Sequence, residues 1–378
     1  MSSNKNVLIF IDWYYPAFKA GGPIKSVSNM ITLLSTKLNF FIITGDRDLK
    51  DNDSFHDVTL DTWLKKTDYS IIYLSKSKRN KAFYKKLYSD VNPGTIYING
   101  VFSYDFSIKP TRVFASSSAK LIVASRGMLG NNSLKIKPLK KKIFLFLMNL
   151  GNQYKNVVWH LNSSNELQEL EKSVKSIHDK IVVPNLTSVE MGQKVDHKKV
   201  ENELKLISVC RVLPIKNIHF VLSLLNEVSF KCQYSIIGPL EDGDYHQSCI
   251  KLSKELPENI EVEFLGAKKS NQIKIKLNES DVFISSSLNE NYGHSIVEAL
   301  GLAKPILISD QTPWRNLASL KAGADMPLKK DVFLDQLNKF AKMNNDEYQI
   351  YSQGAKSFFN QNMNPNLFKE RYIKLLTS

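Results

Sequence analysis

The stretch that decides the fold reads SSSLNENYGHSIVEALGLAKPILI and runs from Ser285 to Ile308. It follows a short apolar run, residues 281–284, of a composition typical of a buried parallel strand. From His294 the apolar residues have helical spacing, and residues 305–308 are again apolar, as in a second strand. The pattern predicts a strand–loop–helix–strand unit. Its loop, residues 289–293, would lie at the carboxyl end of a strand, where open α/β sheets bind ligands.

Two acidic residues, Glu290 and Glu298, stand eight positions apart across the predicted junction of loop and helix. The backbone N–H groups at the start of this helix would favour a bound phosphate; they belong to Gly293, His294, Ser295 and Ile296. Carboxylates accept hydrogen bonds from paired hydroxyls, so an anion site between two carboxylates suits a sugar nucleotide. The alternative is an acidic first helical turn that complements the helix dipole.

The rest of the chain alternates strands with helices in the same manner, which predicts parallel, doubly wound sheets. Apolar runs at 7–11, 40–44, 70–74, 95–98, 121–124, 157–161, 180–183, 206–209, 234–237 and 260–265 are the other predicted strands. With 378 residues the chain is too long for a typical single domain and suits two.

Composition excludes several classes of protein. The chain is 43% apolar and 23% charged, which is typical of a globular protein. Its longest apolar stretch, residues 143–150, is far shorter than the roughly 20 residues that span a bilayer. The apolar run 7–11 ends at Asp12, which indicates a strand and not a signal peptide. Three cysteines without CxxC spacing indicate reduced cytosolic thiols, not a disulfide framework or a zinc site.

The net charge of +14 is concentrated in one half of the chain. Residues 1–188 hold 27 Lys and Arg against 14 Asp and Glu, whereas residues 189–378 hold 24 against 23. An anionic partner of the first half is expected. No nucleic-acid-binding motif is present, so an anionic membrane surface fits better. The basic run 134–142 continues into the apolar run 143–148, which predicts either an interfacial helix or a core helix with a solvated start.

Several residues are placed by this pattern at the carboxyl ends of predicted strands. Gly21 and Gly22, before a helix that opens at Pro23, would let a ligand approach the backbone, or serve only as a turn. Arg126 follows the strand 121–124 and would hold a phosphate or an acidic acceptor, or pair with a core carboxylate. His160 would face a cleft or be a satisfied strand residue.

Two cations follow the strand 206–209, in the loop that leads to the next predicted helix. Arg211 and Lys216 would clamp a diphosphate, Arg through its planar fork and Lys as a point charge. In isolation, two such cations are usually solvated surface residues.

Three landmarks together resemble the GT-B glycosyltransferases of family 4. Glu290-x7-Glu298, with Gly293 between them, resembles the E-x7-E signature of that family. The segment 206–217 resembles its strand and loop with Arg and Lys five residues apart, and Trp13-Tyr14-Tyr15-Pro16 with Gly21-Gly22-Pro23 resembles its glycine loop. The landmarks occur in the family's order. Cys210, Asn217 and Ala303 depart from glycines that are frequent in the family, which affects loop conformation only.

The resemblance implies two Rossmann-like domains that face each other across a cleft. Residues 1–186 would bind the acceptor, residues 187–357 the sugar nucleotide, and residues 358–378 would form a helix that packs back on the first domain. It also implies transfer with retention of configuration, without a metal or other cofactor. Catalysis is assigned to Glu290, Arg211 and Lys216. The donor site is assigned to Glu298, Gly293, His294, Ser295, Ile296, Gly21, Gly22, Gly238, Leu265 and Gly266.

The expected donor is a UDP- or GDP-sugar, and Arg126 and His160 are candidates on the acceptor side. Asp242-Gly243-Asp244 is interpreted as a turn, not as a metal-binding DxD pair. The basic first half and the lack of an export signal favour a cytoplasmic, peripheral protein. Its acceptor would then be a lipid-linked precursor of capsule, O-antigen or exopolysaccharide. Two alternatives are a sugar-nucleotide epimerase of GT-B architecture and a non-catalytic membrane- or polysaccharide-binding protein.

Overall fold

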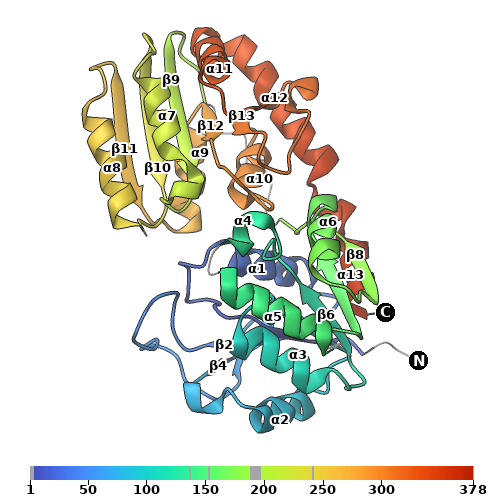
Figure 1. Ribbon diagram of the computed structural model, residues 1–378. Helices are drawn as coiled ribbons and strands as arrows, with labels where there is room; N and C mark the ends of the chain where they lie inside the picture. Colours follow the sequence, from blue (N-terminus) through green and yellow to red (C-terminus); the bar gives the residue numbers. More distant parts are fainter. Residues whose placement is uncertain (1–3, 136–137, 152–153, 188–196, 241, 378) are drawn as a thin grey trace. The chain divides into compact units, whose positions relative to one another are not determined.

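The structure is a computed structural model that describes residues 4–135, 138–151, 154–187, 197–240 and 242–377 (Figure 1). The chain divides into two compact units. Unit 1 comprises Met1–Ser188 together with Pro365–Ser378, and unit 2 comprises Val189–Asn364. Each unit is an α/β layer structure built on its own sheet, as the alternation of strand and helix patterns predicts.

Unit 1 contains a sheet of eight described strands in the order β3-β4-β2-β1-β5-β6-β7-β8. The strands are β1 (Asn6–Phe10), β2 (Asn39–Gly45), β3 (Leu64–Lys65), β4 (Tyr69–Leu74), β5 (Thr95–Asn99), β6 (Lys120–Ala124), β7 (Val157–Leu161) and β8 (Asp179–Val182). All pairs are parallel except β3 with β4. The helices are α1 (Gly22–Leu34), α2 (Lys81–Val91), α3 (Lys109–Phe114), α4 (Asn131–Leu134), α5 (Pro138–Leu150), α6 (Ser164–Ser173) and α13 (Lys369–Thr377).

The strands of unit 1 bury side chains on both faces, because helices cover both faces. In β1, Val7 and Ile9 belong to one apolar cluster, while Leu8 and Phe10 belong to the other. Helices α1 and α13 contribute to the first cluster, and α2 and α5 contribute to the second.

Unit 2 contains a parallel sheet of six described strands in the order β11-β10-β9-β12-β13-β14. The strands are β9 (Glu203–Val209), β10 (Lys231–Ile237), β11 (Ile260–Gly266), β12 (Val282–Ser285), β13 (Ile306–Ser309) and β14 (Gly323–Met326). The helices are α7 (Ile218–Leu225), α8 (Gly243–Lys254), α9 (Ser270–Glu279), α10 (His294–Gly301), α11 (Lys330–Lys342) and α12 (Asn345–Asn362). The unit predicted from residues 285–308 is therefore β12, α10 and β13.

Three features differ from the sequence predictions. The division between units falls after Ser188 instead of residue 186, and the returning segment begins at Pro365 instead of 358, because α12 continues to Asn362. The residues interpreted as a turn at 242–244 begin helix α8 instead. There, the side chain of Asp242 caps the helix by accepting a hydrogen bond from the backbone N–H of Tyr245 at 3.0 Å.

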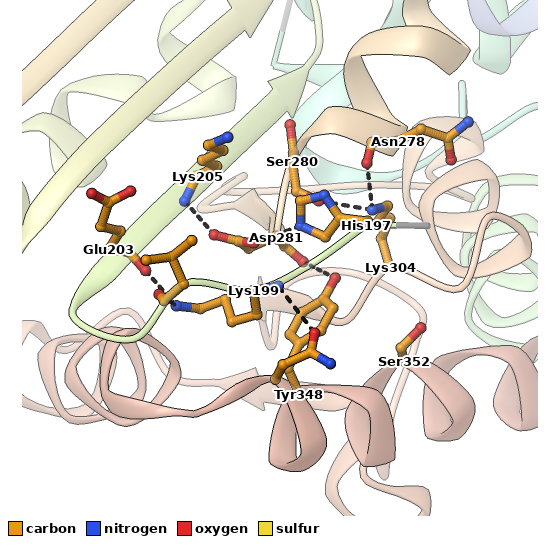
Figure 2. A network of polar contacts seen from close by, with 12 residues as sticks. His197, Lys199, Glu203, Lys205, Asn278, Ser280, Asp281, Lys304, Tyr348 and Ser352 are labelled. Carbon is orange, nitrogen blue, oxygen red and sulfur yellow. Dashed lines mark hydrogen bonds and ion pairs between the residues drawn. The ribbon is translucent and has the colours of Figure 1, made fainter. Parts of the chain in front are cut away.

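A polar network anchors the start of unit 2 at the amino ends of β9 and β12 (Figure 2). Asp281, which is buried, accepts a hydrogen bond from the backbone N–H of Lys205 at 2.7 Å and lies 2.7 Å from Nε2 of His197. The hydroxyl of Tyr348 in α12 donates to the carbonyl of Asp281 at 2.8 Å. The buried ammonium of Lys304 donates to two backbone carbonyls at the end of α9 and after it. This network fixes the chain as it enters the sheet.

None of the helices in the described part of the chain combines the length and the apolar character that crossing a bilayer requires.

Candidate active site

The strand order of unit 2 places a ligand site between β9 and β12. From β9 the chain builds β10 and β11 on one side, and it then returns to build β12, β13 and β14 on the other. The loops after β9 and β12 therefore diverge at the carboxyl edge of the sheet and leave a crevice, where open α/β sheets bind ligands. The first of these loops carries Arg211 and Lys216, and the second carries Glu290.

Lys216 and Glu290 form an ion pair across this crevice. Their side chains are 16% and 18% exposed, so the pair is largely removed from water and yet reachable by a ligand. Lys216 ends a short 3-10 helix, Pro214–Lys216, and Asn217 follows it in the left-handed conformation with φ of +56°. That turn directs the chain into α7.

Two serines tie the same loops together. Ser286, which is buried, donates to the carbonyl of Asn217 at 2.7 Å. Ser287 donates to the carbonyl of Asn289 at 2.9 Å and lies 3.5 Å from a carboxylate oxygen of Glu290. The backbone N–H of Leu288 donates to the carbonyl of Ile215 at 2.8 Å. The positions of Lys216 and Glu290 are thus fixed by the scaffold.

A small cavity opens between the two loops. Its lining includes Cys210, Lys216, Ser286, Glu290 and Ser295, the second residue of α10. Burial raises the pKa of the Cys210 thiol to about 11, so this cysteine is uncharged at neutral pH. The cavity therefore holds one cation, one carboxylate and several hydroxyl groups.

Helix α10 begins at this cavity. Gly293 precedes it with φ of +75°, and no described side chain caps the helix. The positive φ of Gly293 favours glycine, and a Cβ atom there would also crowd the side chains of Ile296, at 2.8 Å from Cδ1, and Glu290, at 3.2 Å from Cγ. Ser295 and Ile296, with His294, are the first residues of the helix, as the sequence predicts. Without a cap, the positive end of the helix dipole favours an anion.

Glu298 lies in the second turn of α10, and its charge contributes to the raised pKa of the buried Tyr292, of which burial is the main cause. Tyr292 lies in the loop 289–293, but its side chain packs in the core of unit 2 against Trp314. The indole N–H of Trp314 donates to the carbonyl of Tyr292 at 2.6 Å, and this hydrogen bond attaches the loop 289–293 to the core of unit 2.

The glycines predicted for the donor site have different structural roles. Gly238 follows β10, and a Cβ atom there would lie 1.8 Å from the carbonyl oxygen of Cys210. A side chain at this position would prevent the close contact between the loops after β9 and β10. This packing contact explains the glycine, and no ligand needs to be invoked. Gly266, with Leu265 at the end of β11, has φ of +66° and open space where a side chain would stand. Its carbonyl accepts from the N–H of Gly238 at 2.9 Å.

In unit 1, the predicted acceptor residue Arg126 follows β6 with φ of +52°. Its guanidinium donates to side-chain oxygens of Asn99 at 2.7 Å, Asn162 at 3.3 Å and Asn185, and to the hydroxyl of Tyr97 at 2.7 Å. The guanidinium of Arg126 is therefore hydrogen-bonded to a shell of uncharged side-chain acceptors, and not to a core carboxylate as the alternative prediction had it. Such a shell orients the guanidinium without neutralising its charge.

His160 is buried in β7, and both of its ring nitrogens have partners. Nδ1 lies 2.6 Å from the hydroxyl of Tyr97, and Nε2 lies 2.9 Å from the carbonyl of Val183. Burial and the charge of Arg126 lower its pKa to about 3, so the ring is neutral. This geometry favours the satisfied strand residue over a direct contact with an acceptor. His160 supports Arg126 through Tyr97.

Gly21 and Gly22 are exposed at the start of α1. Gly21 has φ of +63°, and no described atom lies within 4 Å of where its Cβ would stand. The preceding loop is held by Asp48, whose carboxylate accepts from the backbone N–H groups of Phe18 at 2.9 Å and Lys19 at 3.2 Å. The glycines therefore present bare backbone beside a fixed loop.

Unit 1 also contains a buried carboxylate, that of Asp12, which is not among the predicted site residues. Asp12 follows β1, and Ser103, in the loop after β5, donates to it at 2.5 Å. Burial raises the pKa of Asp12 from 3.8 to about 6, against the effects of Ser103 and Arg79. Strands β1 and β5 are the pair at which the strand order of this sheet reverses, so Asp12 lies at the position where open α/β sheets bind ligands. An acidic residue directly after the first strand was the available signal.

Residues 192–356 match the family model described as "Glycosyl transferases group 1". The match covers most of unit 2, including the crevice with Lys216 and Glu290. This match supports the assignment of the chain as a glycosyltransferase, while the narrower assignment to family 4 stays a prediction. No curated protein matches the chain in sequence.

Solved structures resemble the whole chain. HepE (Alr3699) of Anabaena, in complex with UDP and glucose, matches with a TM-score of 0.70 at 12% identity, over 99% of this chain and 100% of that one. Sucrose-phosphate synthase of Thermosynechococcus elongatus matches with a TM-score of 0.74 at 11% identity, over 98% of this chain and 97% of that one. WaaG, a glycosyltransferase involved in lipopolysaccharide biosynthesis, matches with a TM-score of 0.68 at 10% identity, over 98% of this chain and 100% of that one. These likenesses confirm the predicted GT-B fold of two parallel-sheet α/β domains.

Proposed function

We propose that the protein is a retaining, metal-independent glycosyltransferase that moves a sugar from a nucleotide sugar to a glycan acceptor. The observation that carries this proposal is the ion pair of Lys216 and Glu290 at the strand-order reversal of unit 2. The pair lies within the segment that matches the glycosyl transferases of group 1. It combines a cation for a leaving diphosphate with a carboxylate for a sugar hydroxyl.

The proposed donor is a UDP- or GDP-sugar. HepE, which has the same fold, is solved in complex with UDP-glucose, and this supports a donor of the same class here. Lys216, Arg211 and the start of α10 would hold the diphosphate, and Glu298 would accept hydrogen bonds from the ribose hydroxyls. Gly266 and Leu265 would contact the base, and the exposed backbone of Gly21 and Gly22 is proposed as a further donor-binding segment.

In the proposed reaction the acceptor hydroxyl oxygen bonds to the anomeric carbon on the face that the diphosphate leaves. The bond between that carbon and the diphosphate oxygen breaks, and the proton of the acceptor passes to the departing diphosphate. Lys216 and Arg211 would neutralise the charge that develops there, and the α10 dipole would add to this. Glu290 would hold the transferred sugar in place, so no covalent adduct is needed.

Unit 1 would bind the acceptor, with Asp12 and Arg126 at the carboxyl edge of its sheet. A lipid-linked precursor of capsule, O-antigen or exopolysaccharide is the proposed acceptor. Support comes from the basic character of the first half and from WaaG, whose fold this chain shares and which is involved in lipopolysaccharide biosynthesis. The protein would then work in the cytoplasm, peripherally at the inner face of the plasma membrane.

The test is a thermal-unfolding screen of the purified protein against UDP-, GDP-, ADP- and CMP-sugars, with Glu298→Ala in parallel. A ligand at about 100 times its dissociation constant stabilises a protein by about 2.7 kcal/mol. We expect one nucleotide class to stabilise the wild type and not the variant. Incubation of that labelled donor with a lipid extract should then yield labelled lipid. Conversion of the donor alone, without an acceptor, would indicate an epimerase instead.

A further inference from the structure

Helix α5, in unit 1 (Figure 1), exposes an unusual amount of apolar surface. Five of its large apolar side chains are between 51% and 73% exposed: Leu139, Ile143, Phe146, Leu147 and Leu150. Among the other described α-helices, only α8, α9 and α12 carry a large exposed apolar side chain, and each has one: Leu252, Ile275 and Ile350. The apolar surface of α5 therefore requires a specific explanation.

The five exposed side chains form one continuous stripe. Successive residues of a helix are about 100° apart around its axis, and at this spacing the five fall within an arc of about 100°. Met148 lies on the opposite side and is buried, and Phe144 and Leu145 pack beside it against the core of unit 1. The ring of Phe144 meets that of Phe102 edge-on, with 5.5 Å between their centroids. Because its inner face is anchored in the core, α5 cannot rotate to bury the stripe.

Lysines border the stripe on both sides. Lys140 and Lys142 are exposed and fall at its two edges by the same helical spacing. The surrounding sequence has the same character, because residues 106–165 hold ten Lys and Arg and no Asp or Glu. Lys141 has another role, since its ammonium donates to the carbonyl of Ser133 at 2.6 Å and lies over the ring of Phe102.

We infer that α5 is a membrane-docking helix that inserts its stripe, Leu139, Ile143, Phe146, Leu147 and Leu150, into the surface of an anionic lipid bilayer. Lysines at the border of an apolar face extend their ammonium groups towards phosphate headgroups while their alkyl stems stay in the apolar layer. Protein–protein interfaces are depleted in Lys, which disfavours a protein partner. A nucleic acid would use the lysines but not five exposed apolar side chains. This inference rests on the proposed function only for the idea that the acceptor is held in a membrane.

The test is flotation of the full chain with vesicles of phosphatidylcholine alone and of phosphatidylcholine with phosphatidylglycerol. We expect the wild type to float with the anionic vesicles, and less so at high salt. The variant Phe146→Ser/Leu150→Ser should lower the partition coefficient at least about tenfold, because two large apolar side chains no longer enter the lipid. Lys140→Gln/Lys142→Gln should lower it about fivefold for each lysine, and only with anionic vesicles.

A matched control removes exposed apolar side chains from other helices. Ile275→Ser/Ile350→Ser, in α9 and α12, should float like the wild type. All variants are compared with the wild type in thermal unfolding and in stabilisation by the donor nucleotide without vesicles. Both should be unchanged, so a failure to bind lipid is separable from a failure to bind the donor.

Three outcomes would overturn the inference: equal flotation of wild type and the α5 variant, no flotation of the wild type, and a wild-type dimer that the α5 variant converts to monomer. The last result would assign the stripe to a second copy of the chain.

Discussion

Lys216 and Glu290 belong to loops that follow neighbouring strands, β9 and β12, and their ion pair spans the point at which the strand order of unit 2 reverses. In unit 1, Ser103 and Asp12 have the same relationship to β5 and β1. Both sheets thus hold a largely buried carboxylate at the point where their strand order reverses. In unit 2 its partner is a cation, which suits a diphosphate, and in unit 1 the direct partner is a hydroxyl.

Replacement of Glu290 by Gln should lower turnover by a factor of about 100 to 1,000 while donor binding survives. The amide keeps the shape of the side chain but loses the charge that orients the sugar and holds Lys216. Steady-state kinetics and nucleotide affinity measure the two effects separately. Glu227→Gln is the control, because Glu227 follows α7, at the opposite end of that helix from Lys216, and forms an exposed ion pair with Lys330. Equal loss of turnover and of nucleotide affinity would rule out this role for Glu290.

Asp12→Asn should stabilise the protein at neutral pH while lowering transfer to the acceptor. Folding raises the pKa of Asp12 from 3.8 to about 6, so the folded state binds this proton more tightly. The free energy of unfolding therefore falls as pH rises from about 4 to 6, by up to roughly 3 kcal/mol. Urea unfolding should show the variant to be more stable by about 1–2 kcal/mol at pH 7.5, with little gain at pH 4. A variant less stable at pH 7.5 would contradict this account.

His160 should make the protein sensitive to acid. Its pKa is lowered from 6.5 to about 3 in the folded state, so below pH 6.5 the unfolded chain binds a proton that the folded chain does not. The stability that this difference provides is fully present above pH 6.5 and is lost as pH falls towards 3, at up to about 1.4 kcal/mol per pH unit. Urea unfolding at pH 4.5, 5.5 and 6.5 should show a shallower pH dependence for His160→Gln. Identical slopes would mean that His160 is protonated in the folded protein.

Gly238→Ala should destabilise unit 2 by about 3 kcal/mol or more, because its methyl group would overlap the carbonyl of Cys210. Gly243→Ala is the matched control: Gly243 is the first residue of α8 and has open space at its Cβ position. That change should be neutral or slightly stabilising. Thermal unfolding of both variants measures the contrast, and similar melting temperatures would disprove the close contact.

Much of the fold follows from local sequence pattern. The apolar runs that predict strands become β1, β2 and β4 to β13, because short β-branched runs bounded by Gly, Asn or Pro have few other stable arrangements. Ser163 caps α6, with the backbone N–H of Glu166 3.3 Å from its hydroxyl, and a serine three residues before a glutamate is a spacing typical of a helix start. Strand β14 was missed, since GADM carries little apolar signal and pairs with β13 only through tertiary context.

The candidate sites were less predictable where function depends on side-chain partners. The proximity of Lys216 to Glu290 follows from the order of the strands, which one sequence does not reveal. The shell of Asn99, Asn162 and Asn185 around Arg126 joins the last residue of β5 with residues that follow β7 and β8, and no sequence spacing predicts it. The sequence also left open whether α5 is buried or interfacial, because both of its faces are apolar and only the packing shows which one is covered.

The last helix has a consequence for how the protein is made. Leu375 and Leu376 of α13 are buried in the core of unit 1, and their carbonyls accept from Lys120 Nζ at 2.8 Å and Thr95 Oγ1 at 2.7 Å, at the starts of β6 and β5. A ribosome completes residues 1–188 well before it reaches this helix. Part of the core of unit 1 therefore stays uncovered until all of unit 2 has been translated. Unit 1 cannot complete its folding before unit 2 is synthesised.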